Sequence, residues 1–174
     1  PNADLNAHES LLKSNDEYLH DLKEYECILK NSSDNKQIME VLDRILSDQM
    51  MIGYSINSIY ELSQRFKKNN DFDSLSKLQK KLSTSEELNN FLMEKIASKK
   101  LGIIRKIDYY TFWKDITGKT NERIERLINE AFVKIALTKR SNNQSQYIFK
   151  RTLFASMDKH NLLDSETLFT IINS

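Results

Sequence analysis

One apolar stripe constrains the fold of this chain more than any other feature. Between residues 38 and 66, nine positions recur in alternating steps of four and three residues, the spacing that keeps side chains on one face of an α-helix. Gln49 and Ser63 are the polar members, and they either fix the register of a helix seam by hydrogen bonds or simply tolerate a solvated edge. We expect one long helix over residues 34–68. The seven apolar seam residues are Ile38, Leu42, Ile45, Ile52, Ile56, Ile59 and Phe66.

The segments on both sides of this stripe have the same helical pattern. Apolar spacing predicts a helix over residues 4–30 and another from residue 72, with a kink or a new start at a capping box formed by Thr84 and Glu87. The chain has three glycines, and its one proline stands first, so no interior proline breaks a helix. Because short turns join long helices in antiparallel order, we expect residues 1–98 to form an elongated, antiparallel, three-helix bundle that resembles a coiled coil.

Residues 99–174 have shorter stripes and predict a smaller helical part. One helix is expected to end near Trp113, another to follow it, and a last short helix to be capped by Asp164 or Ser165. Two arrangements fit residues 133–151: helices on both sides of a polar loop, which we favour, or a β-hairpin that would make a winged-helix-like unit. The expected fold class is therefore all-α.

The charge of the chain is unevenly distributed, although the net charge is only +1. Residues 1–98 have a net charge of −5, residues 99–151 of +8 and residues 152–174 of −2. A basic block of this size can bind nucleic acid, an anionic membrane or an acidic partner. It can also neutralise the acidic part of its own chain or simply be solvated, and we favour these two interpretations. The candidate partner or nucleic-acid contacts in it are Lys99, Lys100, Arg105, Lys106, Lys139, Arg140, Lys150 and Arg151.

Aromatic residues separate the cations of this block. Lys99 to Lys106 are expected within two turns of one helix, and Tyr109, Tyr110, Phe112 and Trp113 follow them. Cations beside aromatic rings are what proteins use to bind single-stranded nucleic acid, by backbone attraction and base stacking. The competing interpretation, which we favour, is that the rings belong to a core that lysine and arginine stems cover.

The sequence Gly118-Lys119-Thr120 suggests the end of a phosphate-binding P-loop. A P-loop also needs a glycine five residues before this Gly and a buried strand ahead of it, but Trp113 occupies the glycine position and the upstream residues are helical in pattern. We therefore expect a turn between helices, in which Gly118 relieves backbone strain and Thr120 or Asn121 caps the next helix.

No other residues predict catalysis or metal binding. The histidines His8, His20 and His160 have no Cys or second His at ligand spacing, and the carboxylate pairs lie in polar surroundings. The lone cysteine, Cys27, cannot form an internal disulfide, which favours a reducing compartment. No segment is long and apolar enough for a membrane span. We expect no enzyme activity, cofactor, metal or small-molecule substrate, and an intracellular location, cytoplasmic or nuclear.

The remaining property is surplus apolar surface on long amphipathic helices. Five large side chains of the second helix lie outside its seam, and they can be buried in the third helix, in a symmetric partner or in another subunit. We therefore expect a non-enzymatic protein–protein interaction or assembly module, a subunit of a larger intracellular complex, that binds a protein partner or itself. The alternative is a nucleic-acid-binding module that uses residues 99–151. The five surplus residues are Val41, Leu46, Met50, Met51 and Tyr60.

Overall fold

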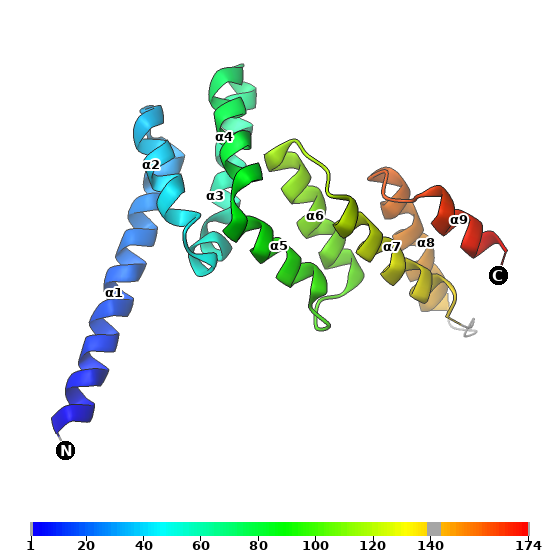
Figure 1. Ribbon diagram of the computed structural model, residues 1–174, viewed down its shortest axis with the longest axis horizontal. Coiled ribbons are helices and arrows are strands. Elements are labelled where there is room, and N and C mark those ends of the chain that lie inside the picture. Colours follow the sequence, from blue (N-terminus) through cyan, green and yellow to red (C-terminus); the bar gives the residue numbers. More distant parts are fainter. Residues whose placement is uncertain (1, 139–143, 174) are drawn as a thin grey trace. The chain divides into compact units, whose positions relative to one another are not determined.

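The computed structural model describes the backbone of residues 2–138 and 144–173, and the side chains of residues 15–138, 144 and 147–173. The described residues form nine α-helices and no strand, which confirms the all-α class (Figure 1). Two compact units divide the chain, residues 1–91 and residues 92–174.

In the first unit, the main contacts between helices are made by α1 and α3. α1 packs against α2 and α3, and α3 packs against α4. Aliphatic side chains from all of them are buried, including Leu29, Leu42, Ile59 and Leu78. The helices of this unit are α1 (Asn2–Asn31), α2 (Asn35–Ile45), α3 (Gln49–Lys68), α4 (Phe72–Thr84) and the first part of α5 (Glu86–Ala97).

The single helix predicted over residues 34–68 is wrong, because the chain breaks between α2 and α3. Asp48 takes an extended conformation and its carboxylate accepts a hydrogen bond from the Met50 N–H at 2.8 Å, while the Ser47 hydroxyl donates to the Arg44 carbonyl at 2.6 Å. Short polar side chains that bond to nearby backbone compete with the helix in this way. Ile45 and Ile52, on the two sides of the break, are nevertheless both buried.

The predicted seam therefore faces the interior although it runs over two helices. Six of its seven apolar residues are buried, and Ile56 is half-buried. Of its polar members, Gln49 donates to the Glu87 carboxylate on α5 at 3.1 Å, whereas the Ser63 hydroxyl donates to the Tyr60 carbonyl in its own helix at 2.7 Å. Only Gln49 thus bonds across elements.

The predicted start or kink near residue 84 is a break between α4 and α5, but its cap differs from the expected one. The Leu88 N–H donates to the Ser85 hydroxyl at 3.1 Å, so Ser85 caps α5. The Thr84 hydroxyl instead donates to the Lys80 carbonyl at 2.8 Å and ends α4. The capping box is displaced because Thr84 satisfies a carbonyl of the preceding turn.

The second unit contains the end of α5 and four further helices. They are α6 (Ile103–Thr117), α7 (Glu122–Ala136), α8 (Gln144–Lys159) and α9 (Ser165–Ile172). α7 packs against both α6 and α9, and its Asn129 amide donates to the Leu162 carbonyl in the turn before α9 at 2.6 Å. As predicted, Asp164 caps α9, accepting from the Thr167 N–H at 2.7 Å.

The hairpin alternative for residues 133–151 is wrong for the described part of that segment. α7 continues to Ala136 and α8 begins at Gln144. Both are helical because their apolar residues keep helical spacing: Phe132 on α7 and Leu153 and Met157 on α8 are buried. With no strand among these residues, the winged-helix resemblance is lost.

Candidate interaction surfaces

The P-loop-like residues form a turn between two helices. Gly118 has φ 66°, in the left-handed region, and its N–H donates to the Lys114 carbonyl at 2.8 Å. Asn121 caps α7, because its side-chain oxygen accepts a hydrogen bond from the Ile124 N–H at 3.2 Å. Both predictions for this turn are confirmed, and the element before it is α6, a helix rather than the strand that a P-loop requires.

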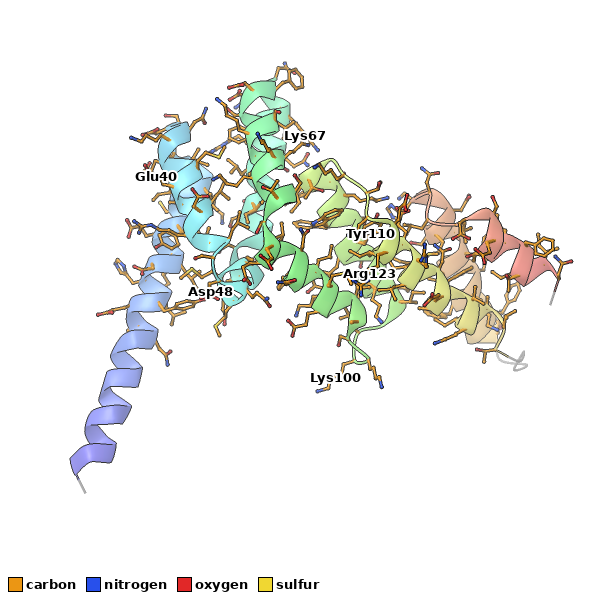
Figure 2. All side chains as sticks on the ribbon, viewed as in Figure 1. Glu40, Asp48, Lys67, Lys100, Tyr110 and Arg123 are labelled. Atoms are coloured by element: carbon orange, nitrogen blue, oxygen red, sulfur yellow. The ribbon has the colours of Figure 1, made fainter. Side chains whose placement is uncertain are left out.

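The buried side chain of Tyr110 on α6 holds the same turn in place by hydrogen bonds (Figure 2). Its hydroxyl donates to the Glu125 carboxylate at 2.7 Å and accepts from the Asn121 N–H at 2.9 Å. Burial raises the pKa of the Tyr110 phenol, and the neighbouring Glu125 carboxylate adds to the shift. A neutral, doubly bonded phenol at this position holds α6 and α7 together and is not poised to exchange a proton.

The aromatic residues of the basic block belong mainly to the core. Tyr110 and Trp113 are both buried and stack on each other, with ring centroids 6.1 Å apart. Lys114 Nζ lies 5.2 Å from the Tyr110 ring centre and donates to the His160 carbonyl at 3.3 Å. Neither buried ring is accessible to a nucleic-acid base, so two of the four rings that the nucleic-acid interpretation needs for base stacking are lost.

The first cluster of predicted contact residues lies on two elements. Lys99 and Lys100 are exposed in the turn between α5 and α6, and Figure 2 labels Lys100 there. Arg105 is exposed and Lys106 half-buried on α6. The expectation that all four share one helix is wrong, because Gly102 is extended at the N-cap of α6 and the chain turns before it.

The second cluster of predicted contacts lies on α8 or outside the described residues. Lys150 is half-buried and donates to the Thr138 carbonyl at 2.7 Å, which attaches α8 to the end of α7. Arg151, its neighbour, is exposed. Lys139 and Arg140 lie outside the residues that the structure describes. Arg151 is therefore the one described member of this cluster that remains available to a partner.

Large exposed apolar side chains are concentrated on α8 and α9. Phe169 and Ile172 on α9 are 70% and 78% exposed, and Tyr147 on α8 is 68% exposed. The sequence predicted this last short helix but did not reveal that Phe169 and Ile172 on it face solvent. The available signal was the number of apolar residues in α9, which exceeds what one packed face of an eight-residue helix accommodates.

The surplus apolar residues predicted for the first unit divide into two groups. Val41 and Leu46 are buried, and Met51 and Tyr60 are half-buried, so these four contribute to the packing of their own unit. Met50 remains 62% exposed on α3, where Tyr54, one turn later, is 60% exposed. α3 thus has a smaller exposed apolar surface than the sequence predicted for this part of the chain.

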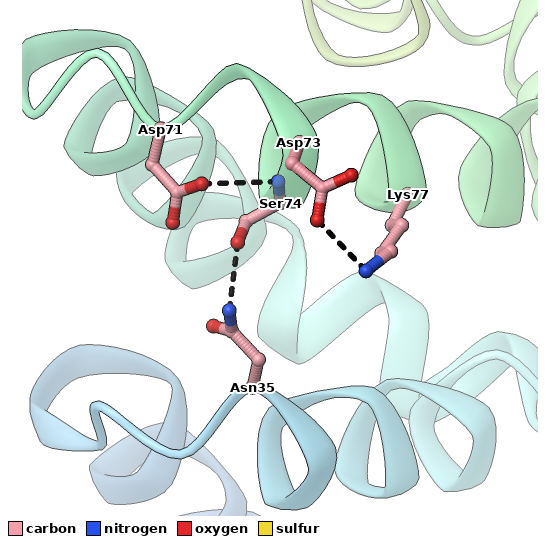
Figure 3. Close-up of polar contacts among 5 residues, drawn as sticks. All are labelled: Asn35, Asp71, Asp73, Ser74 and Lys77. Atoms are coloured by element: carbon pink, nitrogen blue, oxygen red, sulfur yellow. Dashed lines mark hydrogen bonds and ion pairs between the residues drawn. The ribbon is translucent and has the colours of Figure 1, made fainter.

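Polar contacts fix the starts of α2 and α4 to each other (Figure 3). The Asn35 amide donates to the hydroxyl of Ser74, a buried residue, at 2.7 Å, and the Ser74 N–H donates to Asp71 at 3.2 Å. Hydrogen bonds from Ser74 lower the pKa of the Asp71 carboxyl. Lys77 pairs with Asp73 at 2.8 Å on the outer side of α4. These contacts are structural, because each of them joins two groups of the same unit.

A groove of about 710 Å³ runs beside this region, between α2 and the α4–α5 break. Its cations include Lys77 and Lys81, and the latter pairs with Asp43 across the groove. Glu86 and Glu87 also line it. Because three lysines and three carboxylates line it, the groove has no net preference for an anionic or a cationic ligand.

One group of possible metal ligands occurs among the described side chains. His20, Asp21 and Glu24 lie on α1 with their ligand atoms within 4.8 Å of one another, and all three are exposed. They come from a single helix face and leave the other side of any ion to water, which is a poor match to the closed sites of structural metals. Separately, no helix among the described residues is long and apolar enough to cross a membrane.

Comparison with known proteins identifies no relative. No protein-family model, no curated protein and no solved structure matches this chain. The surfaces of the protein are therefore the basis on which its function is inferred.

Proposed function

We propose that this chain is a non-enzymatic, helical protein–protein interaction or assembly module, a subunit of a larger complex. The observation that supports this most directly is the outer face of α9, where Phe169 and Ile172 are 70% and 78% exposed. Burying a Phe or Ile side chain contributes about 1.5–3 kcal/mol each, so a partner that covers both gains substantial affinity. Exposed apolar surface of this kind is characteristic of binding sites.

The geometry of α9 makes this face a suitable docking element. Thr167 is buried on the side that packs on α7, and Asp164 fixes the start of the helix. Phe169 and Ile172 are three residues apart and so lie on one face of the helix, away from Thr167. Helix-in-groove recognition uses anchors at this spacing.

The proposal includes a scaffold and a location. Residues 1–98 would form an antiparallel, coiled-coil-like bundle, and residues 99–174 a smaller, basic helical part that docks a protein partner or a second copy. An intracellular location, cytoplasmic or nuclear, is supported by Cys27, the only cysteine, which is an exposed free thiol.

The test is a tagged full-length chain that carries Phe169→Ser and Ile172→Ser, expressed in the cells that make the protein. The proposal predicts that stoichiometric partners of the unaltered chain are lost from the double variant, whose far-UV circular dichroism stays unchanged. A matched control with Glu166→Gln and Thr170→Ser alters exposed polar positions of the same helix and should keep the partners. A chain that is monomeric and partner-free in native extract would refute the proposal.

A nucleic-acid-binding module is the second candidate, supported by the exposed cations Lys99, Lys100 and Arg105 around the α5–α6 turn. Its test is titration with short DNA and RNA over a range of salt concentrations. If these cations contact phosphates, Lys99→Glu with Lys100→Glu should weaken binding of all sequences and reduce the slope of log K against log salt by about 2. Absence of binding at low salt would eliminate this candidate.

A further inference from the structure

α8 carries a stripe of four residues, Tyr147, Arg151, Phe154 and Asp158, on a side of the helix that its own unit covers only in part. Their 4-3-4 spacing places them along one line of the helix, as in a coiled-coil seam. Tyr147 and Phe154 are 68% and 43% exposed, and Arg151 and Asp158 are exposed. The packed side of the helix is different, because Leu153 and Met157 are buried there.

The two charges of this stripe have no helical neighbour that neutralises them. The residues three and four positions from Arg151 are Tyr147, Ile148, Phe154 and Ala155, all uncharged. Asp158 has Phe154 and Ala155 before it and Asn161 and Leu162 after it at these distances. Among the described residues neither charge has an ion-pair partner.

Arg151 and Asp158 also cannot neutralise each other within one helix. They are seven residues apart, which is about 10.5 Å along the helix axis at 1.5 Å per residue. An ion pair requires its charged atoms to lie within about 4 Å of each other. After Tyr147, the stripe therefore presents a cation, the ring of Phe154 and an anion in this order along the helix.

A stripe with this order of charges is complementary to itself when one copy is reversed. In an antiparallel pair related by a two-fold axis near Phe154, Arg151 of each chain lies beside Asp158 of the other, so both ion pairs form at once. A parallel pair would place like charges together. We propose that this stripe of α8 binds a second copy of the chain in antiparallel orientation, an inference that rests on the proposed function and names the partner of this surface.

The centre of the stripe suits such a contact. The Phe154 ring lies 6.1 Å from the Phe132 ring of α7, which fixes its position before binding. The neighbouring Ala155 is exposed and small, so a Phe154 ring from the opposite helix can be accommodated over it. One 16-residue helix offers much less than the roughly 800 Å² per partner of a standard interface, so the self-association is weak and depends on protein concentration.

Sedimentation velocity of the full-length chain over a wide concentration range tests this inference. Arg151→Glu and Asp158→Lys each place like charges at both ends of the pair, so each should weaken self-association by about tenfold or more. The double variant Arg151→Glu/Asp158→Lys restores the attraction and should associate as the unaltered chain does. Lys159→Glu reverses an exposed charge on another face of α8 and should change nothing.

A mixture of the two single variants is a further test, because recovered association would show that neither variant fails to associate merely through misfolding. An equimolar mixture of Arg151→Glu and Asp158→Lys should form a heterodimer more strongly than either variant forms a homodimer. The inference is overturned if the unaltered chain is monomeric at all concentrations, or if the double variant and the mixture fail to recover association. If that happens while the Phe169 and Ile172 double variant still loses its partners, the proposed function stands and only this inference falls.

Discussion

The hydroxyl of Tyr110 on α6 donates a hydrogen bond to the carboxylate of Glu125 on α7 at 2.7 Å. The same hydroxyl accepts the Asn121 N–H at 2.9 Å, so one side chain connects the end of one helix with the first turn of the next. Because Tyr110 is fully buried, water cannot replace these bonds. The turn that contains Gly118 is therefore fixed by a polar contact in the interior of the second unit.

Tyr110→Phe should destabilise this unit by about 1–2 kcal/mol, because it leaves the Asn121 N–H without a partner while keeping the ring. Urea unfolding followed by the fluorescence of Trp113, the only tryptophan and the stacking partner of Tyr110, measures the change. Tyr147→Phe is the control, since that hydroxyl belongs to a 68% exposed side chain. Equal midpoints for the two variants would show that the buried hydroxyl contributes nothing.

The raised pKa of Tyr110 predicts a loss of stability in alkaline solution. The unfolded phenol titrates near 10.0, and burial raises the folded pKa above that value. The folded state therefore holds its proton more tightly, so this contribution is complete below pH 10 and is lost as the pH rises through the folded pKa. Unfolding free energies from Trp113 fluorescence at a series of pH values should decline above pH 10, and less steeply in Tyr110→Phe. Parallel curves would contradict this assignment.

Two glycines at helix ends make a matched pair for testing backbone strain. Gly118 has φ 66°, where a Cβ is disfavoured, so Gly118→Ala should cost about 1 kcal/mol. Gly102 has φ −67°, and a Cβ there would meet no atom within 4 Å, so Gly102→Ala should change stability by less than about 0.5 kcal/mol. Urea unfolding of both variants decides the matter, and a cost at Gly102 equal to that at Gly118 would show that conformation is not the cause.

The sequence predicts the helices of this chain better than their ends. Apolar spacing located the seam, and most of it is buried, because core packing depends on the same periodicity that the sequence displays. The break at Asp48 was missed, since Ile45 and Ile52 are seven residues apart and stay in phase as if one helix were continuous. Only two adjacent polar residues, Ser47 and Asp48, signal that break, and such residues are also common on an exposed helix face.

The surfaces were harder to predict than the helices because exposure depends on which elements meet. Tyr110 and Trp113 look the same in a sequence whether they stack on bases or on each other, and only the packing of α7 on α6 decides the outcome. Likewise, Phe169 and Thr167 lie two residues apart on α9, yet the polar residue is buried and the aromatic one is exposed. The spacing of residue types shows which residues share a helix face, but it does not show which neighbouring helix covers that face.

The packing of the first unit gives a last prediction, on α3. Ile59 is fully buried, so Ile59→Ala should destabilise the unit by about 2–5 kcal/mol through lost burial and the cavity left behind. Ile56→Ala, at a half-buried position of the same seam, should lower the unfolding free energy clearly less. Met50→Ala, at a 62% exposed position, should lower it by less than about 0.5 kcal/mol. Thermal unfolding followed by far-UV circular dichroism ranks the three. If Met50→Ala proved as costly as Ile59→Ala, Met50 could not be the solvent-facing residue and Ile59 the buried one on α3.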